Sequence, residues 1–513
     1  MNLASLAETN LARFGEYERL VFEGKTYTNR ELHEASRRFA RALTDLGLAP
    51  GDKVIVMMPN CPEVLVAYPA IWRAGMTVIP VLFLLEPREL ELILRSSRAR
   101  AIVTSPDVYP KVGQATRKLE TKPLIIVAAE DGATPAGSLL FAELVAKSPA
   151  TESIVERGAG DLATILFTSG TTARPKGVMQ THDNLVANSM NSWNTAMHRE
   201  PGEATLLTLP LAHSFGLGVI LSGYRFGNRS ILMRRFDAGQ ALKLIEQHKV
   251  KAMSGVPTMF VDMLAHPDAH RYDTSSVKRW VVGAAAMPTE QLLEFERKFG
   301  GTMYVGYGLS EAGPGVAADR EGMPRKPGST GVPLEGVLVK IVGDDGVELP
   351  RGQVGEICVS GASVSPGYYE NQEGTAETFR NGWLHTGDLG YLDEDGYLFV
   401  VDRMKDLIIR GGLNIYPRDV EEVIHTHPAV QEVAVVGVPD TRMGEEVCAY
   451  LVARPGVGVS AEEIIAHCHA NLAKYKTPRY VQIVSNLPKT NIGKIQRKEL
   501  RRLAATRFAR QGG

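Results

Sequence analysis

The sequence predicts an α/β fold with a large N-terminal domain and a small C-terminal domain. Up to about residue 327, short apolar runs alternate with segments of helical periodicity, a pattern typical of mainly parallel sheets covered by helices. The pattern then changes near residue 328 and again near residue 402. In the first part we expect strands at 54–58, 76–80, 101–104, 124–127, 163–167, 206–209, 230–233, 280–282 and 303–305, and helices at 238–248 and 290–299.

The rest of the chain predicts two smaller units. Strands at 337–342 and 356–360, divided by turn residues, indicate a small antiparallel, barrel-like subdomain. From about residue 403 the expected order is helix, two strands, helix and strand, which favours a separate α+β domain. The expected domains are 1–402, with an α/β part at about 1–327 and a β-rich part at about 328–402, and 403–513; the last should hold helices at 417–426 and 461–472 and strands at 432–438, 447–452 and 480–484.

Charge and composition exclude several classes of protein. The 513 residues include 57 Lys and Arg against 58 Asp and Glu, so the net charge is −1 and the basic footprint of a nucleic-acid binder is missing. Hydrophobic residues make up 44% of the chain, enough for large buried cores. We therefore expect an enzyme-sized globular protein without a nucleic-acid partner; the composition leaves open whether it forms a homodimer.

Cysteine spacing and hydropathy bear on the compartment. The four cysteines form no CxxC pair, which argues against a disulfide framework and against a zinc ribbon. The apolar stretch 64–85 is interrupted by Pro69, Arg73 and Pro80, so we do not expect an integral membrane segment. The N-terminus lacks the pattern of a secretory signal and predicts a short amphipathic helix. A cytoplasmic location is expected.

The most informative segment is Thr-Ser-Gly-Thr-Thr-Ala-Arg-Pro-Lys-Gly at 168–177, directly after an expected strand. Small residues let backbone N–H groups approach a polyphosphate, and the Lys176 cation adds attraction. The segment is not a Walker A loop, because Pro175 occupies the second glycine position. The candidate phosphate-binding residues are Thr168, Ser169, Gly170, Thr171, Thr172 and Lys176.

This string resembles the phosphate loop of the adenylate-forming superfamily, which contains acyl-CoA synthetases, nonribosomal adenylation domains and firefly luciferase. Further motifs follow in the order that the family has, so the resemblance spans almost the whole chain. It implies that the α/β part consists of two similar subdomains and that the C-terminal domain is mobile. The further motifs are PLAHSFG at 210–216, GYGLSE at 306–311, TGD at 386–388, DRMKD at 402–406 and PKTNIGKI at 488–495.

The resemblance implies a nucleotide site for ATP. Tyr307 would stack on adenine, Asp388 would bind the ribose hydroxyls, and Arg403 would contact ribose or phosphate. Glu311 would be the protein ligand of Mg²⁺, which prefers hard oxygen donors and keeps several waters. The remaining residues implied for this site are Gly283, Ala284 and Ala285 beside the adenine, together with Gly308 and Ser310.

The resemblance also implies how the chemistry is divided between two orientations of the C-terminal domain. Lys494 would bridge the attacking carboxylate and the α-phosphate, where a positioned cation stabilises the transition state. Rotation about a hinge at Lys405 would then remove Lys494 and bring Gly412 to line the tunnel for the pantetheine of coenzyme A. His213 would be the gate between ATP and the acyl pocket.

Small residues predict an open acyl pocket. Relatives restricted to acetate carry a bulky aromatic residue where this chain has Gly308, and the neighbouring pocket positions are small as well: Ser214, Gly306 and Gly313. No acidic residue occurs between 211 and 229, where an amino-acid-activating relative has an aspartate for the ammonium group. An apolar acid without an amine is therefore expected.

The resulting prediction is an ATP-dependent acyl-CoA synthetase for a medium- or long-chain fatty acid. An aryl-acid CoA ligase and an enzyme that loads the pantetheine of a carrier protein are the alternatives. A binding protein that senses nucleotide without chemistry is a third reading, and the presence of Lys494, Glu311 and Asp388 disfavours it.

Overall fold

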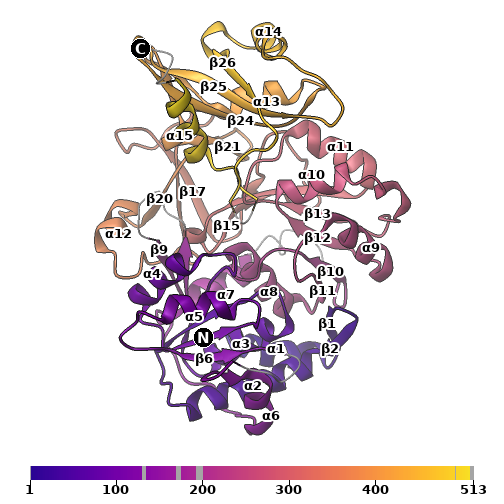
Figure 1. Ribbon diagram of the computed structural model, residues 1–513, viewed down its shortest axis with the longest axis vertical. Coiled ribbons are helices and arrows are strands. Elements are labelled where there is room, and N and C mark those ends of the chain that lie inside the picture. Colours follow the sequence, from indigo (N-terminus) through magenta and orange to yellow (C-terminus); the bar gives the residue numbers. More distant parts are fainter. Residues whose placement is uncertain (1, 130–134, 169–174, 192–199, 491–492, 509–513) are drawn as a thin grey trace.

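The structure is a computed structural model that describes residues 2–129, 135–168, 175–191, 200–490 and 493–508. Two large sheets form the body of the molecule, an antiparallel sheet lies beside them, and the C-terminal domain lies at the opposite end from the N-terminus (Figure 1). This agrees with the expected α/β fold with a large N-terminal and a small C-terminal domain. None of the described helices has both the length and the apolar character needed to cross a bilayer.

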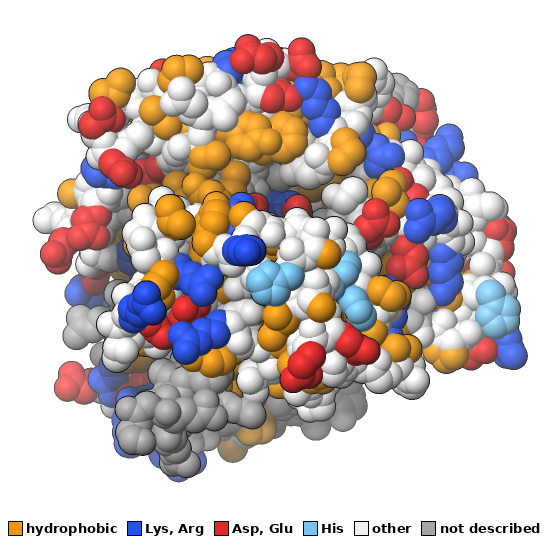
Figure 2. Space-filling model, turned by 90° about the horizontal axis from the view of Figure 1, so that it is seen from above, with side chains coloured by type: hydrophobic (Ala, Val, Ile, Leu, Met, Phe, Trp, Pro, Cys, Tyr) orange, Lys and Arg blue, Asp and Glu red, His pale blue; other side chains and the backbone are white. Residues whose placement is uncertain are grey.

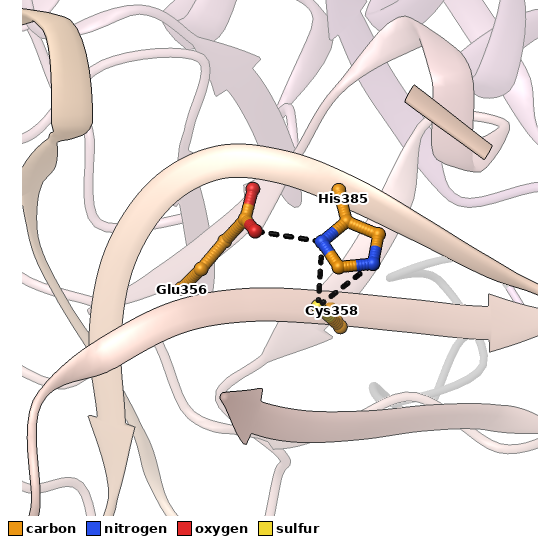
Figure 3. Close-up of side chains that lie close together, drawn as sticks. All are labelled: Glu356, Cys358 and His385. Carbon is orange, nitrogen blue, oxygen red and sulfur yellow. Dashed lines mark hydrogen bonds and ion pairs between the residues drawn. The ribbon is translucent and has the colours of Figure 1, made fainter. Parts of the chain in front are cut away.

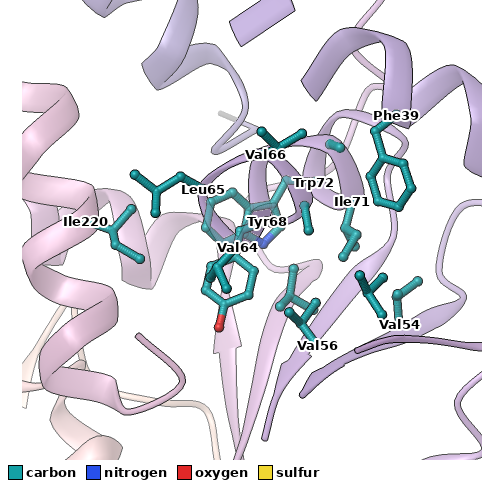
Figure 4. Close-up of a cluster of buried hydrophobic side chains, with 14 of the residues drawn as sticks. Phe39, Val54, Val56, Val64, Leu65, Val66, Tyr68, Ile71, Trp72 and Ile220 are labelled. Atoms are coloured by element: carbon teal, nitrogen blue, oxygen red, sulfur yellow. The ribbon is translucent and has the colours of Figure 1, made fainter. Parts of the chain in front are cut away.

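The first sheet is seven-stranded and buried on both faces. Along β3, Val54 and Val56 pack toward α2 and α3 with Phe39, Tyr68 and Trp72 (Figure 4), while Ile55 and Met57 pack toward α4 and α5. Its strands, in spatial order, are β7 (Leu139–Leu140), β6 (Leu124–Val127), β5 (Ala101–Thr104), β3 (Lys53–Met57), β4 (Thr77–Pro80), β8 (Leu162–Thr168) and β9 (Lys176–Thr181). Its helices are α2 (Asn29–Asp45), α3 (Pro62–Arg73), α4 (Pro87–Ser97), α5 (Tyr109–Thr116), α6 (Phe141–Lys147) and α7 (His182–Asn191).

The second sheet is nine-stranded and has a parallel centre with antiparallel edges. Its strands, in spatial order, are β16 (Val332–Pro333), β15 (Gly315–Ala318), β14 (Thr302–Gly308), β13 (Arg279–Val282), β12 (Ala252–Gly255), β10 (Ala204–Leu207), β11 (Arg229–Leu232), β1 (Glu18–Phe22) and β2 (Lys25–Thr28). Its helices are α1 (Ser5–Phe14), α8 (Ser214–Phe226), α9 (Ala238–His248), α10 (Pro257–Ala265) and α11 (Thr289–Phe299).

The two α/β subdomains are therefore interleaved along the chain. Strand β1 pairs in parallel with β11, with Leu20 opposite Ser230, so the N-terminal hairpin belongs to the second sheet although the first sheet follows it in sequence. Most expected strands are confirmed, and β5, β6 and α9 have the expected bounds. Strand β12 was not expected, because its sequence Ala-Met-Ser-Gly lacks the β-branched residues that mark a strand.

The third sheet is antiparallel, as expected for the β-rich part. Its pairings run from β17 through β18 to β20, with β19 and β21 both on β20; in residues 337–403, all of them described, no pairing closes the sheet into a ring. The elements are β17 (Val337–Val342), β18 (Gly355–Gly361), α12 (Gln372–Thr378), β19 (Phe379–Arg380), β20 (Trp383–Leu392) and β21 (Leu398–Arg403).

The C-terminal domain has a five-stranded sheet with its own cores on both faces. Neighbouring residues of β24 divide between them, since Val435 packs with α13 and α14 and Val436 packs with α15. Figure 2, viewed from this end of the molecule, shows hydrophobic side chains gathered around a hollow, with charges of both signs spread over the face. The elements are β22 (Ile408–Arg410), β23 (Leu413–Ile415), α13 (Pro417–His425), β24 (Val430–Asp440), β25 (Gly444–Ala453), α14 (Ala461–Asn471), β26 (Tyr480–Ile483) and α15 (Arg497–Phe508).

The side chain of Asn60 joins the carboxyl ends of strands from both large sheets. It lies just after β3, and its amide nitrogen donates to the carbonyls of Leu209 and Met233 at 3.0 and 3.1 Å, which follow β10 and β11. Its amide oxygen accepts from the backbone N–H of Leu211 at 2.9 Å. Because Asn60 is only 5% exposed, these three backbone groups have no access to water as a substitute partner.

We expect Asn60→Ala to lower the free energy of unfolding by about 3 kcal/mol or more, because each buried group left without a partner costs about 1–3 kcal/mol. Urea unfolding followed by tryptophan fluorescence measures this change. Asn414→Ala, at an exposed position of β23, is the control and should stay within about 0.5 kcal/mol of the parent. Equal effects of the two substitutions would show that Asn60 does not tie the subdomains together.

Candidate functional site

The predicted site segments gather where parallel strands end. Thr168 ends β8, Gly283 follows β13, Tyr307 and Gly308 end β14, and His213 lies after β10. Ligands of open α/β sheets bind in the crevice outside the carboxyl ends of the strands. The two large sheets therefore present their binding edges at the same side as the segments that the sequence singles out.

Asp388 on β20 is a buried carboxylate held by partners from other elements. The Tyr307 hydroxyl donates to its Oδ2 at 2.6 Å, and Arg403 on β21 forms an ion pair with its Oδ1 at 2.9 Å. The Asp388 side chain is 5% exposed, whereas that of Arg403 is 50% exposed. Burial and the Asp388 charge raise the pKa of Tyr307 well above its usual value, so the phenol stays a donor.

Beside Tyr307, the run after β13 is shaped to let a flat group lie close. Ala284 has a φ of +67°, a conformation that non-glycine residues seldom adopt and that concentrates at ligand sites. Ala285 is exposed and has no side-chain bulk beyond one methyl group. The backbone N–H of Gly283 donates to the carbonyl of Gly255 at the end of β12, which anchors the run.

Glu311 lies in a polar cluster with Tyr368 and Lys176. The Tyr368 hydroxyl donates to Glu311 Oε1 at 2.9 Å, and the Lys176 ammonium lies 4.7 Å from the centre of the Tyr368 ring. Burial and the Glu311 charge raise the pKa of Tyr368. A carboxylate beside a phenol supplies hard oxygen donors, so these residues fit an Mg²⁺ ion held largely by phosphate and water.

The predicted phosphate loop joins the two strands of a hairpin. Thr168 on β8 is opposite Lys176 on β9, and Tyr369 donates its backbone N–H to the carbonyl of Gly177 at 2.7 Å. The predicted residues Ser169, Gly170, Thr171 and Thr172 lie outside the described residues.

The C-terminal domain docks on α10 and α11 of the second sheet. Gln291 on α11 donates to the carbonyl of Gln431 at 3.1 Å, and Arg454 lies 3.6 Å from Glu294. A side-chain atom added at Gly493 would come within 2.5 Å of Thr258 Oγ1 on α10, so the turn before Lys494 lies directly against the N-terminal domain. These contacts fix the position of Lys494.

In this orientation Lys494 lies among the predicted nucleotide-binding residues. Its partial burial and the nearby Arg403 guanidinium lower the pKa of Lys494 to about 8, while the carboxylates of Asp388 and Glu311 act in the opposite direction. Burial and the Lys494 charge lower the pKa of His213 to about 4, so this imidazole is neutral at pH 7. Lys494 is thus near Arg403 and near three groups of the N-terminal domain, Asp388, Glu311 and His213.

His213 and Ser214 begin α8 at the junction with the predicted acyl pocket. His213 Nδ1 accepts from the backbone N–H of Phe215 at 3.3 Å and caps the helix. Ser214 is buried, and its Oγ accepts a hydrogen bond from the Ser310 hydroxyl at 3.1 Å. Gln180 on β9 in turn donates to the carbonyl of Ser310 at 2.8 Å. The 306–311 segment is therefore hydrogen-bonded to both β9 and α8.

Gly308 and Gly313 are small for a reason that the sequence did not reveal. A Cβ atom at Gly308 would lie 1.8 Å from the carbonyl oxygen of Pro314, and one at Gly313 would lie 2.4 Å from the carbonyl oxygen of Ser363. Both positions are closed by backbone packing. Glycine there is accordingly no independent sign of an open acyl pocket, although Gly306 remains a small, buried residue of β14.

The predicted hinge and tunnel residues are both exposed. Lys405 is exposed in a short 3₁₀ turn at 404–406, directly after β21. Gly412 is exposed in the turn between β22 and β23 with a φ of +83°. Asp402 connects this region to the C-terminal domain, because its Oδ2 accepts from the backbone N–H of Arg418 at the start of α13. Burial raises the pKa of Asp402 to about 6.

Sequence reasoning missed Tyr368 and Thr258. Tyr368 lies in a Gly-Tyr-Tyr run that could have been recognised as a candidate, since a tyrosine beside a tight turn offers a hydroxyl to a ligand cluster. Thr258 carries no local signal. Its importance comes from contact with a turn 235 positions later in the chain.

Comparison with known proteins shows the family of this chain. The family of AMP-binding enzymes matches residues 7–369, and the C-terminal domain of the same family matches 419–494. The chain is 36% identical to a long-chain-fatty-acid–CoA ligase of Bacillus subtilis (strain 168), over 97% of this chain and 94% of that protein. It is 37% identical to a feruloyl-CoA synthase of Amycolatopsis sp., over 96% and 97% respectively.

A solved structure extends the likeness to the whole fold. The anthranilate CoA ligase AuaEII in complex with anthranoyl-AMP superposes with a TM-score of 0.94 at 28% identity, over 99% of this chain and 98% of that one. The chain therefore belongs to the family of AMP-binding enzymes, as an acyl-CoA synthetase that uses ATP, Mg²⁺ and CoA.

Proposed function

We propose that this enzyme converts a medium- or long-chain fatty acid to its acyl-AMP with release of pyrophosphate, and then transfers the acyl group to the thiol of CoA. The observation that carries the first half-reaction is the position of Lys494 beside Arg403, Asp388 and Glu311. A carboxylate and the α-phosphate are both anionic, so their approach requires cations already fixed in place.

Each predicted residue then has a role that its surroundings support. Asp388 accepts the ribose hydroxyls while Arg403 neutralises its charge, and Tyr307 and Ala285 present flat, unobstructed surfaces to the adenine. Lys176 is placed for the terminal phosphates. Mg²⁺, held through Glu311, supplies charge neutralisation of the phosphate oxygens. Neutral His213 occupies the junction with the acyl group without adding a competing cation.

The second half-reaction, thioester formation, requires Lys494 to leave the active site. We assign the hinge to Lys405, which is exposed and lies between β21 and β22, and the domain boundary to residues 402 and 403. Rotation about this hinge would withdraw Lys494 from the active site and bring the β22–β23 turn to it. Gly412 at its tip has nothing within 4 Å of an added Cβ atom, so the turn is free to line a narrow tunnel.

The acid is proposed from the apolar character of α8 and from the relatives. Helix α8 has no acidic residue to receive an ammonium group, and its Leu217, Ile220 and Leu221 are buried in the hydrophobic core with α3. Similarity to the long-chain-fatty-acid–CoA ligase of Bacillus subtilis supports an alkyl acid as the substrate of this enzyme. Similarity to the feruloyl-CoA synthase and the anthranilate CoA ligase supports an aryl acid, which is the second candidate.

The four cysteines are free and buried, which supports a reducing, cytoplasmic location.

The assignment of Lys494 predicts that the two half-reactions separate. Lys494→Ala should reduce acid-dependent pyrophosphate release by at least about 100-fold, because it removes a cation from the transition state. Thioester formation from supplied acyl-AMP and CoA should fall less than about threefold. Stopped-time assays of each half-reaction measure this. Lys498→Ala, on the exposed side of α15, is the control; equal loss of both half-reactions in Lys494→Ala would contradict the assignment.

The lowered pKa of Lys494 predicts a pH limit on adenylation. The ammonium form is the active form, so kcat/KM for pyrophosphate release should be full below about pH 7 and fall as the pH rises through 8. The Lys494→Arg variant should release pyrophosphate more slowly, and its kcat/KM should not fall as the pH rises through 8. NMR of ¹³C-labelled lysine, with the signal assigned by its loss in Lys494→Ala, gives a direct reading. A titration near pH 10.5 would contradict the electrostatics.

A panel of acids with CoA as acceptor tests the substrate class. Thioester and AMP, quantified by mass spectrometry, should appear with alkyl acids of about 8–18 carbons at kcat/KM values at least about tenfold above those for ferulate, anthranilate, acetate and amino acids, because an apolar lining gains about 0.8 kcal/mol per buried methylene group. Higher values with the aryl acids would establish the second candidate. Acyl-AMP without thioester, in the presence of CoA, would favour a carrier-protein acceptor.

A further inference from the structure

A group of three side chains on the third sheet lies outside the machinery described above. Cys358 on β18 is directly opposite His385 on β20, and Glu356 lies two residues earlier on the same face of β18. His385 Nδ1 is 2.6 Å from Glu356 Oε2 and 3.4 Å from Cys358 Sγ (Figure 3). One ligand atom from each residue falls within 4.8 Å of the other two.

The donor set of this group is that of a borderline-soft metal. A thiolate, an imidazole and a carboxylate are the usual ligands of Zn²⁺, while Mg²⁺ prefers oxygen alone. Tetrahedral Zn²⁺ separates a bound nitrogen and sulfur by about 3.5 Å, close to the 3.4 Å between His385 and Cys358. The carboxylate of Glu356 would have to withdraw by about 0.8 Å to make room for the ion.

We propose that Glu356, Cys358 and His385 form a binding site for a thiophilic divalent cation such as Zn²⁺. Three protein ligands leave one position for water, as in exchangeable rather than closed structural sites. The Glu356 and His385 side chains are 14% and 15% exposed, so an ion can reach them from solvent.

The same geometry argues against a nucleophilic triad. In such a triad the carboxylate and the nucleophile engage opposite nitrogens of the imidazole. Here both Glu356 and Cys358 are nearest to Nδ1. Cys358 is also completely buried, which leaves no room for a substrate carbonyl.

Charges around the group act on the thiol. Burial and the charge of Glu356 raise the pKa of Cys358 to about 12, whereas Lys340 on β17 and Arg380 on β19 act in the opposite direction. The thiolate is the form that binds a metal, so the ion must displace the proton of Cys358.

Binding of a cation at this site would change the affinity for the nucleotide, and Glu356 connects the two sites. Its second oxygen, Oε1, accepts from the backbone N–H of Gly387 at 3.1 Å, directly before Asp388 on β20. Withdrawal of the carboxylate toward a metal would lengthen this hydrogen bond and loosen this part of β20. By linkage, cation and nucleotide should weaken each other's binding.

Co²⁺ titration of the chelator-treated, full-length protein without nucleotide tests the site. One equivalent should produce a near-ultraviolet thiolate-to-Co²⁺ charge-transfer band. Cys358→Ser should abolish this band, and both Cys358→Ser and His385→Gln should weaken Zn²⁺ binding in calorimetry by at least about tenfold. Cys468→Ser, which removes a buried thiol of α14, is the matched control and should keep the band.

Either of two results would overturn the site: no charge-transfer band in the parent protein, or a band that persists in Cys358→Ser. The link to the nucleotide is tested with AMP, whose binding does not need Mg²⁺. Saturating Zn²⁺ should raise the Kd for AMP at least threefold in the parent and leave it unchanged in Cys358→Ser. An unchanged Kd in the parent would overturn the coupling.

Discussion

The buried carboxylate of Asp388 is the constraint on which the rest of the site depends. A charge in this position is tolerated only with hydrogen-bonding and ionic partners. Its partners come from different parts of the chain: Tyr307 from the second sheet and Arg403 from the last strand before the C-terminal domain. The junction of the second and third sheets, the proposed ribose position and the approach to the proposed hinge are consequently held by one group.

Docking of the C-terminal domain completes the site at an electrostatic cost. Lys494 is partly desolvated and lies beside Arg403, and its lowered pKa reflects the burial first and the repulsion from Arg403 second. A triphosphate would relieve the repulsion by placing negative charge between the two cations. Departure of pyrophosphate would restore much of it and so favour release of the domain. The contacts with α10 and α11 include an exposed ion pair, a kind of contact that adds little to stability, and one hydrogen bond.

The sequence predicted the fold where local pattern decides it and failed where distant contacts do. Buried parallel strands such as β5 and β6 are continuous apolar runs and were recognised with their bounds. No strand was expected at β1, and no local pattern connects it with β11, since Leu20 is paired with Ser230, 210 positions later. In the candidate site, Tyr307, Asp388 and Lys494 came from motifs, and only the structure reveals that Thr258 receives the turn before Lys494.

Glycine in this site gives tight packing more than flexibility. Gly308 and Gly313 are held against backbone carbonyls, and a Cβ atom at Gly331 would lie 1.9 Å from the carbonyl carbon of Ala318. Such contacts allow β14, β15 and their neighbours to approach without intervening side chains. Gly412, in contrast, has open space around it in the part of the chain proposed to move. Glycine therefore serves close backbone packing at the first positions and a left-handed turn conformation at Gly412.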